Sequence, residues 1–337
     1  MNRKKISSGK VVFQQIKSSY LRGNPLRDPA IRKIPVYLPP SYDKGRRFPV
    51  TYCLGGFTST AMSWFNIQAW IPTMNERMDR LIANGMPEMI LVFPDCFTKF
   101  GGSQYLDSSA VGKYQSFLIR EVIPFIDKKF RTIPKRNARG VMGKSSGGYG
   151  ALMLSLEYPK LFSALASHSG DLYFEYAYLP EFPFAVRGLE RAGGLSAYLQ
   201  KFESMPKTSR EDHAILNLVA MSACYSPNPN SQNGFELPVK EHTGELRPEV
   251  WKKWKQKDPV EIVRKNPKML QDFRLIYLDC GRRDEFFLFL GARMFSETLN
   301  KAGILHVYEE FEEGHFNIQH RYDVSLRMLA EALSSKD

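Results

Sequence analysis

The chain has 337 residues, of which 43% are hydrophobic and 13% aromatic. This composition supports a sizeable core and excludes a disordered protein, and the length allows one large or two medium domains. The 47 basic residues outnumber the 35 acidic residues, which gives a net charge of +12. The densest basic run, residues 251–257, is predicted to be the solvated face of a helix. Because the basic residues are dispersed and no nucleic-acid-binding motif accompanies them, we expect no nucleic-acid partner.

The cysteines and the N-terminal sequence indicate the cellular compartment in which the protein is expected. The four cysteines are widely spaced, with no CxxC pair and no Cys/His cluster at metal-ligand spacing. We therefore expect reduced, largely buried thiols and no metal site. The first ten residues carry positive charge but no apolar run follows them, which predicts no secretory signal. No stretch reaches the length of a membrane span, so a cytoplasmic protein without such a span is expected.

The first half of the chain reads as alternating strands and helices. Residues 10–19 and 34–40 are rich in β-forming residues and are joined by a Pro/Gly/Asp loop, which predicts an antiparallel pair. Further strands are predicted from short apolar runs at residues 49–54, 89–94, 137–142 and 162–168. Helices are predicted from apolar periodicity or helix-forming composition at residues 61–84, 112–130 and 150–157.

Between residues 170 and 273 the pattern changes to short helices, many aromatic residues and polar loops. We interpret this segment as a cap-like insertion over the site, within a single domain of residues 1–337. The alternation then resumes, with strands at 274–279 and 307–311 and helices at 287–302 and 317–333. Buried strands that alternate with helices predict an α/β fold, with a mostly parallel central sheet and helices on both faces. Sites in such sheets lie at the carboxyl ends of the strands.

A Gly-x-Ser-x-Gly match is centred on Ser145, between a predicted strand and a predicted helix. A sharp strand-to-helix turn at this point would lift the serine hydroxyl above the sheet and direct the helix N-terminus at it. The helix and strand nearly touch in such a turn, and the small residues Gly143 and Gly147 suit this contact. Ser146 cannot be the centre of the motif, because Lys144 rather than glycine lies two residues before it. The pattern predicts Ser145 as a nucleophile.

A nucleophilic serine needs a base to take its proton, and the base needs a third group to hold its tautomer. His315 lies between the last predicted strand and the last predicted helix. This position places it at the carboxyl edge of the sheet, so His315 is the first candidate for the base. His168 ends the strand that follows the helix after Ser145 and is the alternative.

Three carboxylates compete for the role of the acid. Asp279 belongs to a predicted strand and is expected to brace the loop, whereas Asp284 lies further out, where it can reach an imidazole. Glu285 is adjacent and stays open as a choice. With Asp284 the residues follow the chain order Ser, Asp, His, which is the order expected for α/β-hydrolases.

The oxyanion that forms on an attacked carbonyl requires two hydrogen-bond donors. The backbone N–H of Ser146, directly after the nucleophile, is predicted to be one of them. The second is expected from the loop after the strand that ends at Leu54. The N–H of Phe57 is the first choice and that of Gly56 the second.

These residues resemble the Putative esterase family of α/β-hydrolases, which includes esterase D (S-formylglutathione hydrolase), feruloyl and acetyl-xylan esterases, enterochelin esterase and mycobacterial mycolyltransferases. The segments that carry the resemblance are residues 37–42, 52–57, 143–151, 279–286 and 313–315. The resemblance extends from about residue 34 to the C-terminus. It implies Ser145 as nucleophile, Asp284 as acid, His315 as base, and Phe57 with Ser146 as oxyanion donors. Gly55 is a departure, because members often carry His or Asp before the oxyanion glycine.

We therefore predict a serine esterase that hydrolyses a carboxylic ester through an acyl-enzyme intermediate, with no cofactor and no metal. A small-molecule ester is the expected partner, and a homo-oligomer stays open. The aromatic residues Phe57, Trp64 and Tyr105 would suit an apolar or aromatic acyl group, but buried aromatic residues belong to the core more often than to a pocket. An acyltransferase with the same triad and a non-catalytic binding protein on the hydrolase fold are the alternatives.

Overall fold

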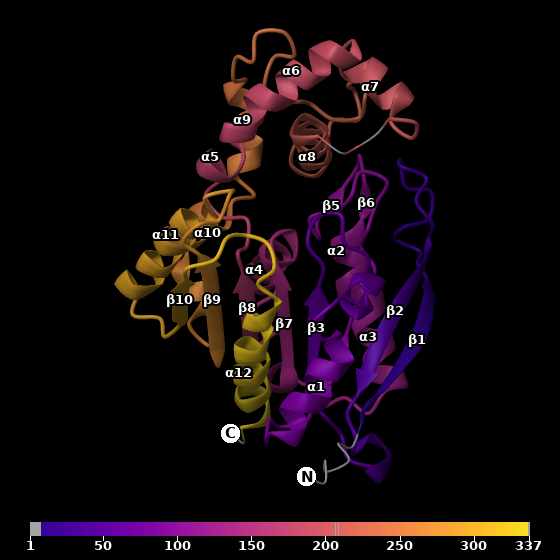
Figure 1. Cartoon of the computed structure of the whole chain (residues 1–337), viewed down its shortest axis with the longest axis vertical. Coiled ribbons are helices and arrows are strands. Elements are labelled where there is room, and N and C mark those ends of the chain that lie inside the picture. The colour runs from indigo at the N-terminus through magenta and orange to yellow at the C-terminus, as the bar shows by residue number, and fades with distance from the viewer. Residues whose placement is uncertain (1–7, 206, 208, 336–337) are drawn as a thin grey trace.

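A computed structural model describes residues 8–205, 207 and 209–335. Residues 1–7, on which the predicted absence of a secretory signal partly rests, lie outside this description. Within the described residues, eight strands form one sheet in the order β1-β2-β4-β3-β7-β8-β9-β10 (Figure 1). The strands are β1 (Lys10–Lys17), β2 (Ile31–Leu38), β3 (Val50–Leu54), β4 (Ile90–Val92), β7 (Arg139–Lys144), β8 (Ala164–His168), β9 (Leu275–Gly281) and β10 (Val307–Phe311).

The sheet is mixed but mostly parallel, as predicted. Strand β2 runs antiparallel to both β1 and β4. The remaining neighbours pair in parallel. A small separate hairpin joins β5 (Asp107–Ser108) to β6 (Gly112–Lys113). Parallel pairing aligns the carboxyl ends of the strands along one edge, where the predicted site residues follow β3, β7, β9 and β10.

Helices cover both faces of the sheet, because side chains alternate along each strand. On β3, Tyr52 and Leu54 enter one core cluster, whereas Cys53 enters the other. Helices α1 (Met74–Ala83) and α12 (Tyr322–Ser334) pack into the cluster that contains Cys53. The opposite face is covered by α2 (Tyr114–Ser116), α3 (Ile123–Lys129), α4 (Ser146–Glu157) and α11 (Leu288–Lys301).

Two predicted helices are interrupted in the structure, each near a proline. Residues 61–84 divide into a 3-10 helix (Ala61–Phe65), an irregular segment and α1. Pro72 disfavours helical geometry in the residue before it, and Thr73 caps α1 together with Glu76. Residues 114–129 are helical, but a π-helical stretch (Phe117–Val122) precedes Pro124. Proline lacks an N–H and clashes with the carbonyl four residues earlier, and the wider turn relieves this clash.

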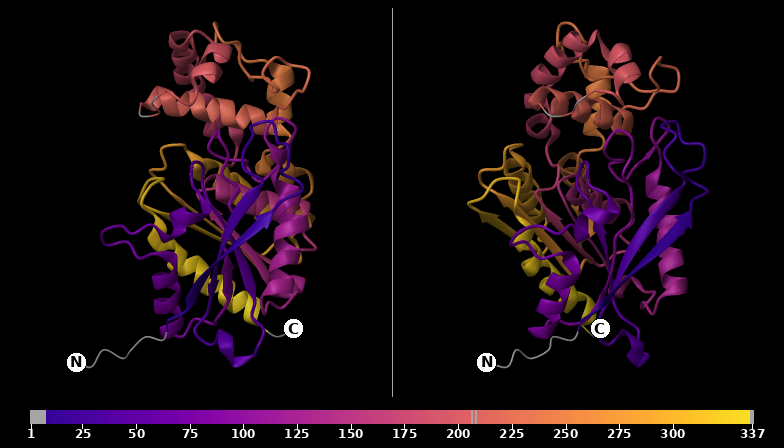
Figure 2. Two further views of the ribbon diagram at one scale, coloured as in Figure 1. Left: turned by 90° about the vertical axis from the view of Figure 1, so that its right-hand side faces the viewer. Right: turned by 45° about the vertical axis from the view of Figure 1, so that its right-hand side comes forward.

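Between β8 and β9 lies the segment that we call the cap, residues 170–273. Figures 1 and 2 show most of its helices beyond the carboxyl ends of the strands, on the side away from both termini. Its helices are α5 (Phe174–Ala177), α6 (Phe182–Ala192), α7 (Leu195–Lys201), α8 (Arg210–Tyr225), α9 (Pro248–Lys255) and α10 (Pro259–Lys265). In α9 the two tryptophans are buried while Lys252 and Lys253 face solvent, as predicted for the basic run. None of the helices in the described part of the chain is long and apolar enough to cross a membrane.

Candidate active site

Ser145 occupies the sharp turn between β7 and α4, with φ 56° and ψ −127°. Few residues other than glycine adopt this conformation, so the surrounding structure must hold it in place. One such restraint is the hydrogen bond from the Ser145 N–H to the carbonyl of His168, at 2.9 Å. The turn therefore presents the hydroxyl at the carboxyl edge of the sheet.

Two glycines allow the turn to be this tight. A Cβ atom at Gly147 would lie 2.1 Å from the carbonyl oxygen of Leu54, and one at Gly143 would lie 2.3 Å from the carbonyl carbon of Gly147. No side chain fits at either position unless the helix moves away from the strands. These contacts explain the glycines on both sides of Ser145.

Asp284 and His315 meet at the same edge of the sheet, from the turns that follow β9 and β10. His315 Nδ1 lies 2.8 Å from Asp284 Oδ2, and the two residues are 3% and 2% exposed. The other oxygen, Asp284 Oδ1, accepts hydrogen bonds from the N–H groups of Phe286 at 2.9 Å and Leu288 at 3.4 Å. The carboxylate is thus anchored on one side and directed at the imidazole on the other.

Glu285, the alternative acid, contacts the backbone of the histidine loop instead of the imidazole. Its Oε2 accepts the N–H of His315 at 2.6 Å. A Cβ atom at Gly314 would lie 2.9 Å from both carboxylate oxygens of Glu285. Glu285 therefore holds the loop that carries His315, while Asp284 contacts the imidazole itself.

His168 and Asp279 form a second, fully enclosed arrangement. His168 Nδ1 lies 2.7 Å from Asp279 Oδ1, and His168 Nε2 lies 2.8 Å from Ser325 Oγ of α12. Burial would raise the pKa of Asp279, but His168, Arg321 and Tyr277 outweigh it and hold the pKa below its usual range. Because His168 and Ser325 are completely buried, no substrate reaches them. This cluster braces β8 and β9 against α12.

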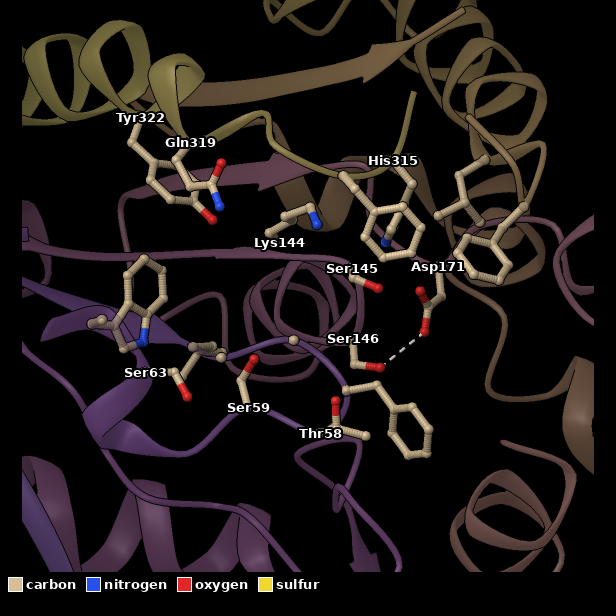
Figure 3. Close-up of a pocket in the computed structure, with 18 of the residues that line it drawn as sticks. Thr58, Ser59, Ser63, Lys144, Ser145, Ser146, Asp171, His315, Gln319 and Tyr322 are labelled. Carbon is tan, nitrogen blue, oxygen red and sulfur yellow. Dashed lines mark hydrogen bonds between the residues drawn. The ribbon is translucent and has the colours of Figure 1, made fainter. Parts of the chain in front are cut away.

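Ser145 and His315 both line a cavity of about 460 Å³ at the carboxyl edge of the sheet. In Figure 3, a ring nitrogen of His315 points toward the Ser145 hydroxyl. The described residues include no hydrogen bond between Ser145 Oγ and His315. In unliganded enzymes such contacts are often long and tighten when substrate binds. The cavity therefore brings together a strained serine, a histidine and a carboxylate that orients the histidine.

The two predicted oxyanion donors lie beside Ser145 and line the same cavity. Ser146 is the first residue of α4, where backbone N–H groups have no partner within the helix. Among the described residues no acceptor is found for the N–H of Phe57, whereas the next N–H, of Thr58, bonds to the Gly101 carbonyl at 2.8 Å. A Cβ atom at Gly56 would lie 3.2 Å from the Lys144 carbonyl oxygen, so this loop packs directly on the turn.

Tyr105 supports that loop in place of the His or Asp that Gly55 replaces. Its hydroxyl donates a hydrogen bond to the Gly55 carbonyl at 2.6 Å. Its ring packs against α4, where a Cβ atom at Gly150 would lie 2.3 Å from it. The expectation that Tyr105 lines the substrate pocket is wrong, since the residue is buried beneath the loop; Phe57 and Trp64 do line the cavity.

Sequence reasoning did not identify two ionisable groups that line the cap side of the cavity, Asp171 and His213. Burial raises the pKa of Asp171, and burial lowers the pKa of His213. Asp171 comes shortly after β8, at the edge where sites are expected, and this was the available signal. On the opposite side, burial lowers the pKa of Lys144, whose Nζ lies 5.4 Å from the centre of the Phe316 ring. No group of His, Cys, Asp and Glu in the described ranges is arranged to hold a metal ion.

Residues 30–322 match the model of a family described as "Putative esterase". The chain belongs to this esterase family. The esterase Rv1288 of Mycobacterium tuberculosis is 32% identical over 143 residues, which cover 40% of this chain and 28% of that protein. The uncharacterized protein YbbA of Bacillus subtilis is 29% identical over 166 residues, which cover 43% of this chain and 59% of that protein. The chain thus spans less than two thirds of the length of these curated relatives.

Solved structures of esterases share the fold over nearly the whole chain. A ferulic acid esterase matches with a TM-score of 0.63 and 22% identity, covering 97% of this chain and 99% of that one. An S-formylglutathione hydrolase from Agrobacterium tumefaciens matches with a TM-score of 0.62 and 17% identity, covering 98% of each chain. The predicted α/β-hydrolase fold is confirmed, and the family is that of an esterase-type hydrolase.

Proposed function

We propose that this family member is a serine esterase that hydrolyses a small carboxylic ester through an acyl-enzyme intermediate. The observation that carries the proposal is the 2.8 Å contact between His315 Nδ1 and Asp284 Oδ2, in a cavity that also exposes Ser145 at a strained turn. An imidazole held through Nδ1 leaves Nε2 free to take the proton of a serine hydroxyl.

The reaction follows from the positions of these groups. Ser145 Oγ attacks the ester carbonyl as His315 takes its proton, and the N–H groups of Phe57 and Ser146 stabilise the oxyanion. His315 then returns the proton to the leaving alcohol, which leaves an acyl group on Ser145. A water molecule activated by His315 attacks this acyl-enzyme and releases the acid. Each oxyanion donor is expected to contribute about 10²- to 10³-fold to the rate.

A fluorophosphonate probe tests the proposed nucleophile directly. The probe is expected to label the wild type at Ser145, as located by peptide mass spectrometry, and to leave Ser145→Ala unlabelled. Ser325→Ala is a matched control, since its hydroxyl lies 2.8 Å from a histidine nitrogen but is fully buried. This control should label like the wild type. Failure of the wild type to label would favour a binding protein on the hydrolase fold.

Transfer to another acceptor is distinguished from hydrolysis by product analysis. In the presence of added alcohols, an esterase is expected to release mainly the free acid, because water reaches the acyl-enzyme. Predominant formation of the new ester over the acid would instead assign an acyltransferase with the same catalytic residues.

A further inference from the structure

The cap-side wall of the cavity carries hydrogen-bond acceptors that the esterase mechanism does not use. Asp171 is 7% exposed and lines the cavity next to the catalytic serine. One of its oxygens, Oδ2, accepts hydrogen bonds from the Tyr178 hydroxyl at 2.9 Å, Gln104 Nε2 at 3.1 Å and the Ser146 hydroxyl at 3.3 Å. Three donors to a single oxygen fix the orientation of the carboxylate.

The second oxygen of Asp171 is available to a ligand. Within the described residues no protein donor contacts Oδ1. In Figure 3, Asp171 directs this oxygen into the space beside Ser145 and His315, while the dashed bond joins its partner oxygen to Ser146. Oδ1 is not fully shielded from solvent, so it is open to the cavity, where a donor group of a bound ligand can take the place of water.

The backbone places Asp171 at this point through close glycine contacts. A Cβ atom at Gly148 of α4 would lie 2.9 Å from the Cα of Gly170, and one at Gly170 would lie 3.1 Å from the carbonyl carbon of Gly148. The turn after β8 therefore lies directly against the helix that begins at Ser146. The position of Asp171 is thus set by a close backbone contact with α4, three residues after the nucleophile.

A second polar residue, Asn217, belongs to the same wall. Asn217 of α8 lines the cavity, and its Oδ1 is shielded from solvent without a hydrogen-bond partner. The cavity-lining residues of the cap are Asp171, Ala177, Tyr178, His213, Asn217 and Met221, and they include no Lys or Arg. This wall therefore presents the Asp171 carboxylate to an incoming group and carries no Lys or Arg to neutralise it.

We propose that Asp171 Oδ1 accepts a hydrogen bond from a hydroxyl or ammonium group of the substrate, and so selects esters that carry such a donor a few bonds from the scissile carbonyl. The proposal deepens the esterase function and rests on it. Asp171 touches the substrate in this role and determines specificity, whereas Ser145 and His315 carry out the chemistry. Both donor classes share one requirement, which is an N–H or O–H directed at the carboxylate.

The test compares esters that differ only in the donor. In an acyl series, methyl butyrate, methyl 3-hydroxybutyrate and methyl 3-aminobutyrate are hydrolysed in a pH-stat; in an alcohol series, propyl acetate is compared with 2-hydroxyethyl acetate. The wild type is expected to prefer the donor-bearing ester in one series by about tenfold to a hundredfold in kcat/KM. Asp171→Leu should abolish that preference. Asp171→Asn keeps an acceptor oxygen but no charge, so it should retain part of a hydroxyl preference and lose an ammonium preference.

Asp258→Asn is the matched control, because Asp258 is also a buried carboxylate of the cap but does not line the cavity. It should leave the substrate preference unchanged. If Asp171 only positioned Ser146, its variants would slow all esters equally, and an unchanged preference would overturn the proposal. Binding of the same ester pairs to Ser145→Ala, measured by calorimetry, tests the selection by Asp171 separately from the esterase function. A donor preference in binding without turnover in the wild type would retain this inference and reject the esterase function.

Discussion

Replacing Asp284 by asparagine is expected to disable the proposed base by fixing the wrong tautomer. Asp284 Oδ1 accepts two backbone N–H groups, from Phe286 and Leu288, so an amide oxygen is held at that position. The amide NH₂ group would then face His315 Nδ1 in place of the carboxylate oxygen at 2.8 Å. Nδ1 becomes an acceptor, the ring proton moves to Nε2, and Nε2 can no longer accept the serine proton.

The expected loss is about 10⁴-fold in kcat, the size of the effect in other serine enzymes, which corresponds to about 5 kcal/mol of transition-state stabilisation. The assay is hydrolysis of p-nitrophenyl butyrate. Glu285→Gln is the matched control, because its amide oxygen can still accept the His315 N–H that Glu285 accepts at 2.6 Å; it should lose less than about tenfold. A loss of less than tenfold in Asp284→Asn, with a large loss in Glu285→Gln, would refute the assignment of the acid.

Three further substitutions test the oxyanion loop, the turn at Ser145 and the ion pairs of Glu310 on β10. Tyr105→Phe removes the 2.6 Å hydrogen bond to the Gly55 carbonyl and should lower kcat about tenfold with little change in KM; steady-state kinetics showing the reverse would exclude a role in holding the oxyanion loop. Gly147→Ala places a Cβ atom 2.1 Å from a strand carbonyl oxygen and should cost about 3 kcal/mol in the free energy of unfolding, measured with urea; an unchanged value would contradict the tight turn. Glu310 accepts hydrogen bonds from two arginines and a tyrosine, and these bonds lower the pKa of its carboxyl group from 4.5 to about 2. Its contribution to stability is therefore present above about pH 4.5 and is lost as the pH falls toward 2. Because both arginines are half exposed, we expect Glu310→Gln to cost about 1 kcal/mol at neutral pH and nothing near pH 2; a cost that persists in acid would rule out the charge as its source.

The features that sequence predicts well here have local causes. Apolar runs such as residues 89–94 identify buried strands, and the pattern around Ser145 requires small residues where a helix meets a strand. The position of His315 after the final strand follows from the alternation of elements, because parallel strands end at one edge. Helix boundaries were less accurate where a proline redirected the chain, as at Pro72 and Pro124.

The features that sequence missed depend on contacts between distant segments. The hydroxyl of Tyr105 reaches the Gly55 carbonyl, and Asp171 reaches the Ser146 hydroxyl. Neither pair has a local pattern, because each contact exists only after the loops have packed on α4. The cluster of His168 with Ser325 resembles a catalytic group, and this too is visible only in three dimensions. The complete burial of both residues excludes substrate.

The most direct test of the account is hydrolysis of a p-nitrophenyl ester panel, from acetyl to decanoyl, by the wild type and by Ser145→Ala. The account predicts that the wild type hydrolyses short esters and that the variant loses at least ~10³-fold in kcat. The chain-length profile of the wild type would then measure how much acyl chain the cavity of about 460 Å³ accepts. Equal turnover by the two proteins would contradict the assignment of Ser145 as the nucleophile.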